Sequence, residues 1–356
     1  MEKIFKRTLL GAVVSAAAFT GTANAAIPLA GDAVQFYGQA AGYMIFANDQ
    51  DDNNFGVDME SRIGFRGTVE FEDFAPNLIW QIEGGNANNG DKSGQLGARD
   101  TYLGLDFDGI GSIKYGRQLV AAYNYVDWPH SNPGLGNVFD WNNDLGVAYQ
   151  DRADSVVRYD SANWGGFTVQ ATISGMENTT DALVASVAAS YSADMFNVHA
   201  GYYHRGEFES AMGENPQYIV DDNTGQLILN PNYVPGGMVV NYENSYAIVG
   251  GSLFLGDVTL TGAYKMMESD SATGSIGQDA WSATAQYVLN SKWVFKAGYA
   301  GTSDADETTD TSDMALTARL GYLLPSTYLY IDSRNYKMND ADEWNNYVLV
   351  GAEYYF

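Results

Sequence analysis

The chain has 356 residues, with 44 acidic and 18 basic side chains, no cysteine and a formal net charge of −26. An acidic balance of this size excludes nucleic acid as a partner, because phosphate binding needs a basic surface. The lack of cysteine excludes a fold that depends on disulfides, and 39 glycines and 25 tyrosines beside eight prolines favour many short strands joined by turns.

Residues 1–25 have the pattern of a secretory signal peptide. Three basic residues lie among the first seven positions, an apolar stretch spans 9–19, and an Ala-Asn-Ala motif ends at Ala25. The stretch is too short to anchor the chain in a bilayer. Removal of this segment leaves 331 residues with a net charge of −28. No later run of about 18 residues is apolar, so a membrane form of this chain must be a β-barrel.

From Val34 onward, segments of about ten residues repeat a two-residue periodicity. In residues 61–73, Ile63 and Phe65 alternate with Arg62 and Arg66, so one face is apolar and the other charged. Sixteen such strands are predicted, at residues 34–47, 61–73, 77–85, 99–107, 112–118, 154–161, 167–174, 182–191, 196–205, 245–255, 257–267, 280–290, 292–301, 314–324, 327–337 and 344–356.

The connections between these strands alternate between long and short. The short ones, such as Asp-Gly-Ile-Gly, contain turn residues. Long loops at one end and tight turns at the other predict an all-β fold, a 16-stranded antiparallel transmembrane β-barrel with extracellular loops and short periplasmic turns, in one domain at 26–356. A soluble β-sandwich would mix its loop lengths. The predicted long loops are residues 47–59, 119–152, 206–243, 268–279, 302–313 and 338–343.

The two faces of the strands support a membrane barrel. In residues 167–174 the odd positions are apolar and the even positions are Thr, Gln, Thr and Ser, which fits a lipid-facing exterior and a polar lumen. The segment 99–107 would place Asp100 outward, which suits a protein–protein contact. Candidates for two aromatic girdles are Trp80, Trp164, Trp281, Trp293, Trp344, Tyr354 and Tyr355.

Several stretches together resemble the general porins of Gram-negative bacteria. They are SRIGFRG, NLIWQIEGG, RDTYLGLDFDGIGSIKYGRQ and DSVVRYDSANWGGF, in this order, and the terminal VLVGAEYYF. The resemblance covers residues 34–356 and implies a homotrimer in the outer membrane, surrounded by lipid and lipopolysaccharide, in which each barrel has its own water-filled pore. It also implies that the third long loop, residues 119–152, folds inward, and that Phe356 is read by the barrel-assembly machinery.

The resemblance places a basic wall at the narrowest part of the pore. Its motifs assign Arg62, Arg99 and Arg152 to this wall, with Arg117 and Arg158 as further members. Fixed charges of opposite sign across a narrow mouth order water and favour polar solutes, and arginine stays charged beside other arginines. The alternative for each arginine is an ordinary salt bridge in the lumen or at the rim.

The acidic side departs from the family pattern. The loop tip, Pro133 to Asp140, lacks the glutamate that the family often has, so the available carboxylates are Asp127, Asp140 and Asp144. Gln39 stands where the family has a lysine. With −28 on the mature chain, we expect a preference for cations.

Two tryptophans of the loop, Trp128 and Trp141, are candidates for sugar stacking, as in oligosaccharide-specific porins, or for anchoring the loop to the wall. The acidic loops at 49–54, 304–310 and 339–343 could bind divalent cations that bridge to lipopolysaccharide. They lack the pattern of an EF-hand, which argues against a dedicated calcium site, and a hydrated acidic surface is the favoured explanation.

No enzyme motif accompanies the three histidines, His130, His199 and His204, so no catalytic residue, metal site or cofactor is predicted. The predicted function is passive diffusion of ions and small hydrophilic solutes. The alternatives are an oligosaccharide-specific porin, or an adhesin or phage receptor that uses the loop at 206–243 and whose pore is incidental. A hydrolase in a barrel is the most distant alternative.

Overall fold

The structure is a computed structural model of the chain. It describes residues 26–49, 52–85, 95–130, 134–135, 139, 144–177, 179–211, 218–220, 226–230, 236–339 and 341–356. The predicted signal peptide lies outside the described residues. No helix within these ranges is long and apolar enough to cross a membrane.

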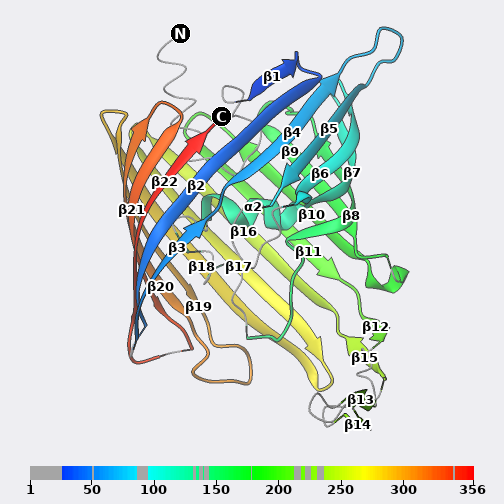
Figure 1. Ribbon diagram of the computed structural model, residues 1–356, viewed down its shortest axis with the longest axis vertical. Helices are drawn as coiled ribbons and strands as arrows, with labels where there is room; N and C mark the ends of the chain where they lie inside the picture. The colour runs from blue at the N-terminus through cyan, green and yellow to red at the C-terminus, as the bar shows by residue number, and fades with distance from the viewer. Residues whose placement is uncertain are drawn as a thin grey trace.

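The main body is one closed antiparallel sheet, seen from the side in Figure 1. It closes because β2 pairs with the last strand, β22, over ten consecutive residue pairs. The strands of the sheet are β1 (Ile27–Ala30), β2 (Val34–Asp49), β3 (Asp52–Met59), β4 (Arg62–Val69), β5 (Asn77–Gly84), β6 (Leu96–Phe107), β7 (Gly111–Leu119), β8 (Arg152–Ser161), β9 (Phe167–Ser174), β10 (Val184–Ser192), β11 (Phe196–Arg205), β16 (Asn244–Leu255), β17 (Val258–Ser271), β18 (Gly274–Leu289), β19 (Trp293–Thr302), β20 (Met314–Leu324), β21 (Thr327–Lys337) and β22 (Asn345–Tyr355).

β2 has two successive partners on one side. β3 pairs with its second half and β4 with its first half. The two therefore form one barrel strand, interrupted at Glu60 and Ser61, where the Ser61 hydroxyl accepts a hydrogen bond from the backbone N–H of Ala41 at 3.1 Å. Because β1 only extends the edge at the start of β2, the barrel has sixteen strands. The predicted fold class and strand number are confirmed.

The wall is apolar outside and polar inside. On β18, Ser282, Thr284 and Gln286 face inward and are almost fully buried, whereas Tyr287 and Leu289 face outward and are 42% and 37% exposed. This alternation continues around the barrel, as expected for a wall that meets lipid outside and water inside.

Two of the predicted long loops are strand extensions with tight turns. Residues 47–59 form the hairpin between β2 and β3, with Asp49 paired to Asp52, and residues 268–279 form the hairpin between β17 and β18, with Ser271 paired to Gly274. The prediction of long loops there was wrong because the polar composition of these segments was given more weight than their two-residue periodicity. Beyond the membrane, polar residues can continue a ladder that the barrel has started.

The loop at 206–243 carries two small antiparallel sheets beyond the rim. β12 (Phe208–Ala211) pairs with β15 (Met238–Asn241), and β13 (Tyr218–Val220) pairs with β14 (Leu227–Leu229). They project at the end of the barrel away from the C-terminus (Figure 1). A short 3-10 helix, η2 (Thr180–Ala182), lies between β9 and β10.

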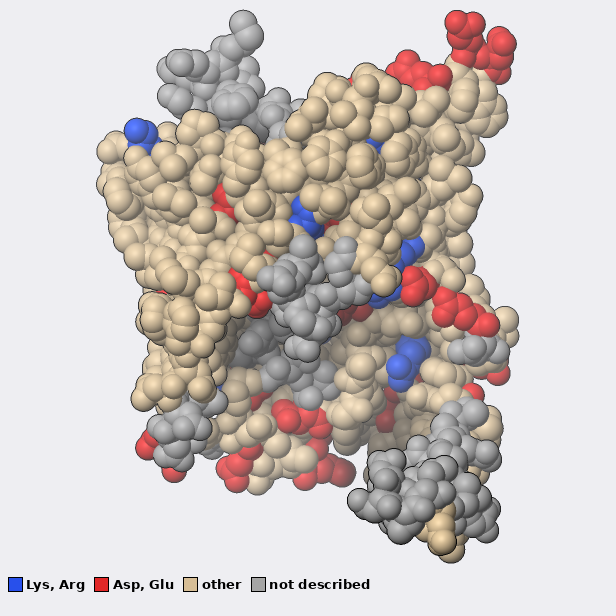
Figure 2. Space-filling view, viewed as in Figure 1, with Lys and Arg blue, Asp and Glu red and all other residues tan. Residues whose placement is uncertain are grey.

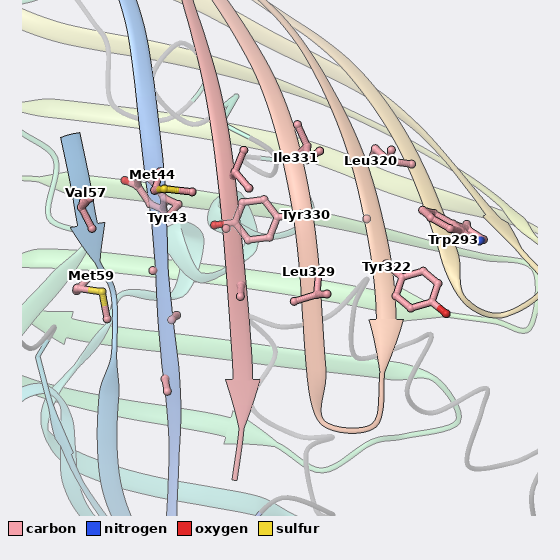
Figure 3. A pocket seen from close by; sticks show the side chains of 17 residues that line it. Tyr43, Met44, Val57, Met59, Trp293, Leu320, Tyr322, Leu329, Tyr330 and Ile331 are labelled. Atoms are coloured by element: carbon pink, nitrogen blue, oxygen red, sulfur yellow. The ribbon is translucent and has the colours of Figure 1, made fainter. Parts of the chain in front are cut away.

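The outer wall has a shallow apolar groove of about 710 Å³ that crosses β2, β3 and β19–β22 (Figure 3). Its lining includes Met44, Val57, Leu329 and Ile331, which belong to the outward face. The groove is therefore part of the membrane-facing surface and does not belong to the pore.

The third long loop runs inside the barrel, as predicted, in its described part. It begins with the helix α2 (Ala121–His130), which Figure 1 shows within the barrel. Val126, Leu135 and Phe139 are fully buried and belong to one cluster with inward-facing wall residues such as Tyr246 and Ile248. The main hydrophobic core of this protein thus lies between the loop and the wall.

Candidate functional site

The start of α2 is attached to the barrel wall by hydroxyl groups. The first N–H groups of a helix have no partner within the helix, and here the N–H of Ala121 donates to Thr172 Oγ1 at 3.1 Å and that of Ala122 to Ser186 Oγ at 2.8 Å. The acceptors lie on β9 and β10. The wall therefore caps the helix and fixes where it enters the lumen.

Glycines of the wall let the loop come close. A Cβ at Gly201 would lie 3.1 Å from Ala122, one at Gly250 would lie 2.9 Å from His130 Nε2, and one at Gly298 would lie 2.8 Å from a methyl group of Leu135. These glycines belong to three different strands, β11, β16 and β19. The loop therefore follows a track along the inner wall that larger side chains would block.

The structure brings together three predicted arginines of the basic wall. Arg62 on β4, Arg99 on β6 and Arg152 on β8 are close enough that the charges of Arg62 and Arg152 both act on the Arg99 guanidinium. Gln39 is paired in register with Arg62 and so belongs to the same part of the wall. Arg62 Nε is buried and has no hydrogen-bond partner within the described ranges.

Two carboxylates of the wall itself balance these arginines. Arg99 Nε lies 2.5 Å from Glu83 Oε1, and Arg152 Nε lies 2.6 Å from Asp100 Oδ1. Tyr37 also donates its hydroxyl to Glu83 Oε2 at 2.8 Å. Neither Glu83 nor Asp100 was predicted as a pore residue, although the alternation of β5 already put Glu83 on the polar face.

Asp100 corrects the sequence prediction, which placed it outward. The register between β5 and β6 shifts between the pairs Ile82↔Thr101 and Gly84↔Leu96, so residues 97–100 bulge. Gly97 has a φ of +92°, a conformation that suits glycine. Asp100 lies on the same inner face of β6 as Tyr102, by regular alternation, and the bulge lets its neighbour Arg99 reach a lumen partner as well, which a regular strand would not allow.

Of the two further arginines, Arg158 lies in the lumen wall and Arg117 does not. Arg158 and Lys114 both bind Asp160, with N–O distances of 2.8 and 2.6 Å. Arg117 lies on the same face of β7 as Ile113 and Tyr115, which are 51% and 58% exposed. Its ion pair, at 3.0 Å, is with Asp154, which is itself mostly exposed. The structure therefore places Arg117 on the outer face, away from the predicted wall.

A second charged cluster on β20 and β21 was missed. Arg319 binds Asp332 through two hydrogen bonds, at 2.6 and 2.7 Å, and Arg334 binds the same carboxylate at 2.9 Å. The Arg319 guanidinium lies 4.2 Å from the centre of the Tyr330 ring. Tyr336 of β21 donates to the carbonyl of Gly134 at 2.6 Å, so the loop reaches this part of the wall.

The predicted acidic side is described only in part. Asp144 is attached to β18, because Gln278 accepts its backbone N–H at 2.9 Å and donates to its Oδ2 at 3.2 Å. Asp127 and Trp128 belong to α2, but their side chains lie outside the description, as do Asp140 and Trp141 altogether.

Phe356 closes the sheet at the end of the chain. Its carbonyl accepts the N–H of Gly38 at 2.8 Å, and its own N–H donates to the Gly38 carbonyl at 3.1 Å. The ring packs against Phe36 and Tyr354, at centroid distances of 5.5 and 6.0 Å. The final residue is thus integrated into the wall.

A closed barrel with a lipid-facing exterior, a charged polar lumen and a helix folded into that lumen defines a channel-forming protein of the outer membrane. The comparisons agree. The Gram-negative porin family matches residues 12–342, and the chain belongs to this family. It is a channel and not an enzyme; in the part of the chain that is described, no three His, Asp or Glu side chains are grouped to hold a metal ion.

Among its relatives, the chain is 33% identical to a chitoporin of Vibrio furnissii over 329 residues, which cover 86% of this chain and 85% of the relative. Its fold is similar to that of an anion-selective porin from Comamonas acidovorans, with a TM-score of 0.67, 17% identity and coverage of 91% and 99%. It is also similar to the trimer form of OmpT from Vibrio cholerae, with a TM-score of 0.66, 22% identity and coverage of 91% and 99%.

Proposed function

We propose that this porin lets ions and small hydrophilic solutes diffuse passively across the outer membrane. The observation that carries the proposal is that α2 lies inside the barrel, in the same lumen as the cluster of Arg62, Arg99 and Arg152. A helix in the lumen narrows the aqueous path, and fixed charges beside that path favour polar solutes over apolar ones.

The preference for cations stays a prediction with two opposing contributions. In the four described ion-pair clusters of the lumen, the cations outnumber the carboxylates: Arg99, Arg152, Arg158, Lys114, Arg319 and Arg334 stand against Glu83, Asp100, Asp160 and Asp332. Figure 2 shows acidic side chains gathered near the two ends of the barrel. A cation preference would therefore arise from the acidic side chains at the mouth of the barrel, and the excess of basic side chains in the lumen wall would oppose it.

A second candidate function is passage of neutral oligosaccharides, which the similarity to a chitoporin favours. Partly exposed tyrosines such as Tyr37 and Tyr102 lie on the inner wall, next to Arg66 and Lys114. Tyrosine rings with nearby hydrogen-bond donors suit sugar rings. Trp128 and Trp141 remain candidates for the same role.

The expected partners follow from the family. We propose a homotrimer embedded in lipid and lipopolysaccharide, with Phe356 as the residue that the barrel-assembly machinery reads. An adhesin or phage-receptor role would use the small sheets at 206–243. Deleting that loop would then abolish binding to cells while leaving conductance unchanged.

A planar-bilayer recording of the purified protein tests the proposal. We expect stable channels that pass current in a salt gradient. If the protein passes oligosaccharides, chitin oligosaccharides should block that current at lower concentration than maltose oligosaccharides of equal length. Equal effects of the two sugars would support general diffusion over oligosaccharide specificity. A lack of channels would refute both proposed functions.

A further inference from the structure

A pair of buried histidines joins the end of α2 to the barrel wall. His130 is the last residue of the helix and His199 lies on β11; their Nε2 atoms are 2.9 Å apart. The two side chains are 0% and 6% exposed. Between neutral imidazoles this contact is one hydrogen bond, in which the Nε2–H of one ring donates to the lone pair of the other.

Two aromatic rings and a glycine pack around the pair. The ring of Phe139 lies 5.8 Å from that of His130, the ring of Tyr125 lies 5.4 Å from that of His199, and Gly250 leaves the space that His130 occupies. The two ends of α2 thus have different attachments. Hydroxyl groups hold the first turn, and they do not titrate; a titratable pair holds the last residue.

The charged groups around His130 are cationic. His199 from β11 and Lys296 from β19 both act on it. β16 and β17, which also pack against α2, carry Tyr246 and Lys265, and the Lys265 ammonium lies 4.6 Å from the Tyr246 ring. On α2 itself the titratable neighbour is Tyr125; the side chain of Asp127 is outside the described set. Burial, and then the charges of His199 and Lys296, lower the pKa of His130 well below its usual value.

We propose that the His130–His199 pair is an acid-sensitive tie that holds the constriction helix against the wall. The proposal rests on the proposed porin function and names a regulation of that same pore. One added proton can still be shared between the rings as N–H⁺···N. A second proton leaves two N–H donors facing each other at 2.9 Å, with no acceptor between them, and two like charges beside Lys296.

The direction of the pH effect follows from the lowered pKa. The attached helix binds fewer protons at His130 than a detached one would, so attachment is complete above about pH 6.5 and weakens as the pH falls below it, toward the lowered pKa. The wall blocks outward movement. A detached helix end therefore moves toward the pore axis, and conductance falls in acid.

The first test is single-channel recording of the mature protein at about pH 7.5 and about pH 4.5. We expect the wild-type conductance to fall about two-fold or more in acid. His199→Gln, which keeps a hydrogen-bonding group near the Nε2 position but does not titrate, should have nearly equal conductance at both values. His204→Gln is the matched control, because it removes the one histidine outside the pair, and should respond like the wild type.

A second variant keeps the test decisive if His199→Gln folds poorly. It is His130→Gln, which places the non-titrating group on the helix instead of on β11. This variant should also have nearly equal conductance at the two pH values, because only one histidine of the pair remains. An acid response that both single variants retain would overturn the proposal.

The outcomes separate the inference from the porin function. Channels whose conductance is the same at both pH values, or an acid response that His199→Gln retains, would overturn the tie and leave the porin function intact. Absence of channels at neutral pH would overturn both.

Discussion

Glu83→Gln tests whether carboxylates of the wall set the ion selectivity. Glu83 is fully buried, lies 2.5 Å from Arg99 Nε and accepts the Tyr37 hydroxyl at 2.8 Å. Glutamine has nearly the same shape: its oxygen can accept from Arg99 Nε in place of Oε1, and its NH2 can donate to the Tyr37 hydroxyl oxygen in place of Oε2, but it carries no charge. The substitution therefore adds one net positive charge to the wall without removing a side chain.

The expected magnitude follows from Coulomb's law. A unit charge about 5 Å from a passing ion in water changes its energy by about 0.8 kcal/mol, which corresponds to a factor of about four in relative permeability. The potassium-to-chloride permeability ratio, obtained from the reversal potential in a KCl gradient, should thus fall by about that factor.

The control is Asp154→Asn, which removes a carboxylate paired with an arginine on the outer face. It should leave the reversal potential unchanged. The reasoning is refuted if Glu83→Gln matches the wild type, or if Asp154→Asn shifts the reversal potential by the same amount as Glu83→Gln.

Three further predictions test the wall, the track and the mouth. Arg62→Ala should raise the potassium-to-chloride permeability ratio by a similar factor of about four. An unchanged ratio would show that Arg62 does not face the aqueous path through the pore. Gly201→Leu should push α2 off its track, because even its Cβ would lie 3.1 Å from Ala122. It should lower both conductance and the free energy of unfolding, the latter by about 1–3 kcal/mol. Gly262→Ala, whose Cβ would have an ordinary 3.7 Å contact, should change neither. If the acidic mouth causes a cation preference, that preference should fade between 0.1 and 1 M salt, because the Debye length falls from about 10 to about 3 Å; a preference that persists would place its origin in the wall.

The barrel could be predicted because its main rule is local. Each strand alternates between lipid and water, so residues such as Thr284 and Leu289 indicate their faces without knowledge of the partners. The same rule was misapplied at residues 47–59, where Phe55 and Val57 continue the alternation within a polar sequence that resembles a loop.

The site could be predicted only in part because it depends on exceptions to that rule. The bulge at residues 97–100 brings Arg99 into the lumen beside Asp100, and a register shift of this kind depends on pairing across strands. Arg117 was assigned to the pore by its motif, yet it lies at a register shift between β7 and β8 and pairs on the outer face with Asp154.

The loop shows a further limit. The sequence of α2, which contains Pro129, has no clear helical signal, and its conformation depends on caps supplied by Thr172 and Ser186 from distant strands. The contact between His130 and His199 joins residues 69 positions apart. Neither histidine has a motif around it, so nothing in the sequence could indicate the pair.

The central claim is that a helix folded into the lumen narrows an aqueous pore. The most direct test compares the single-channel conductance of the mature protein with that of a variant in which residues 123–143 are replaced by a short Gly-Ser linker, after electrophoresis without heating has shown that both barrels are folded. We expect a larger conductance for the variant. Equal conductance in two folded barrels would show that the helix does not narrow the pore.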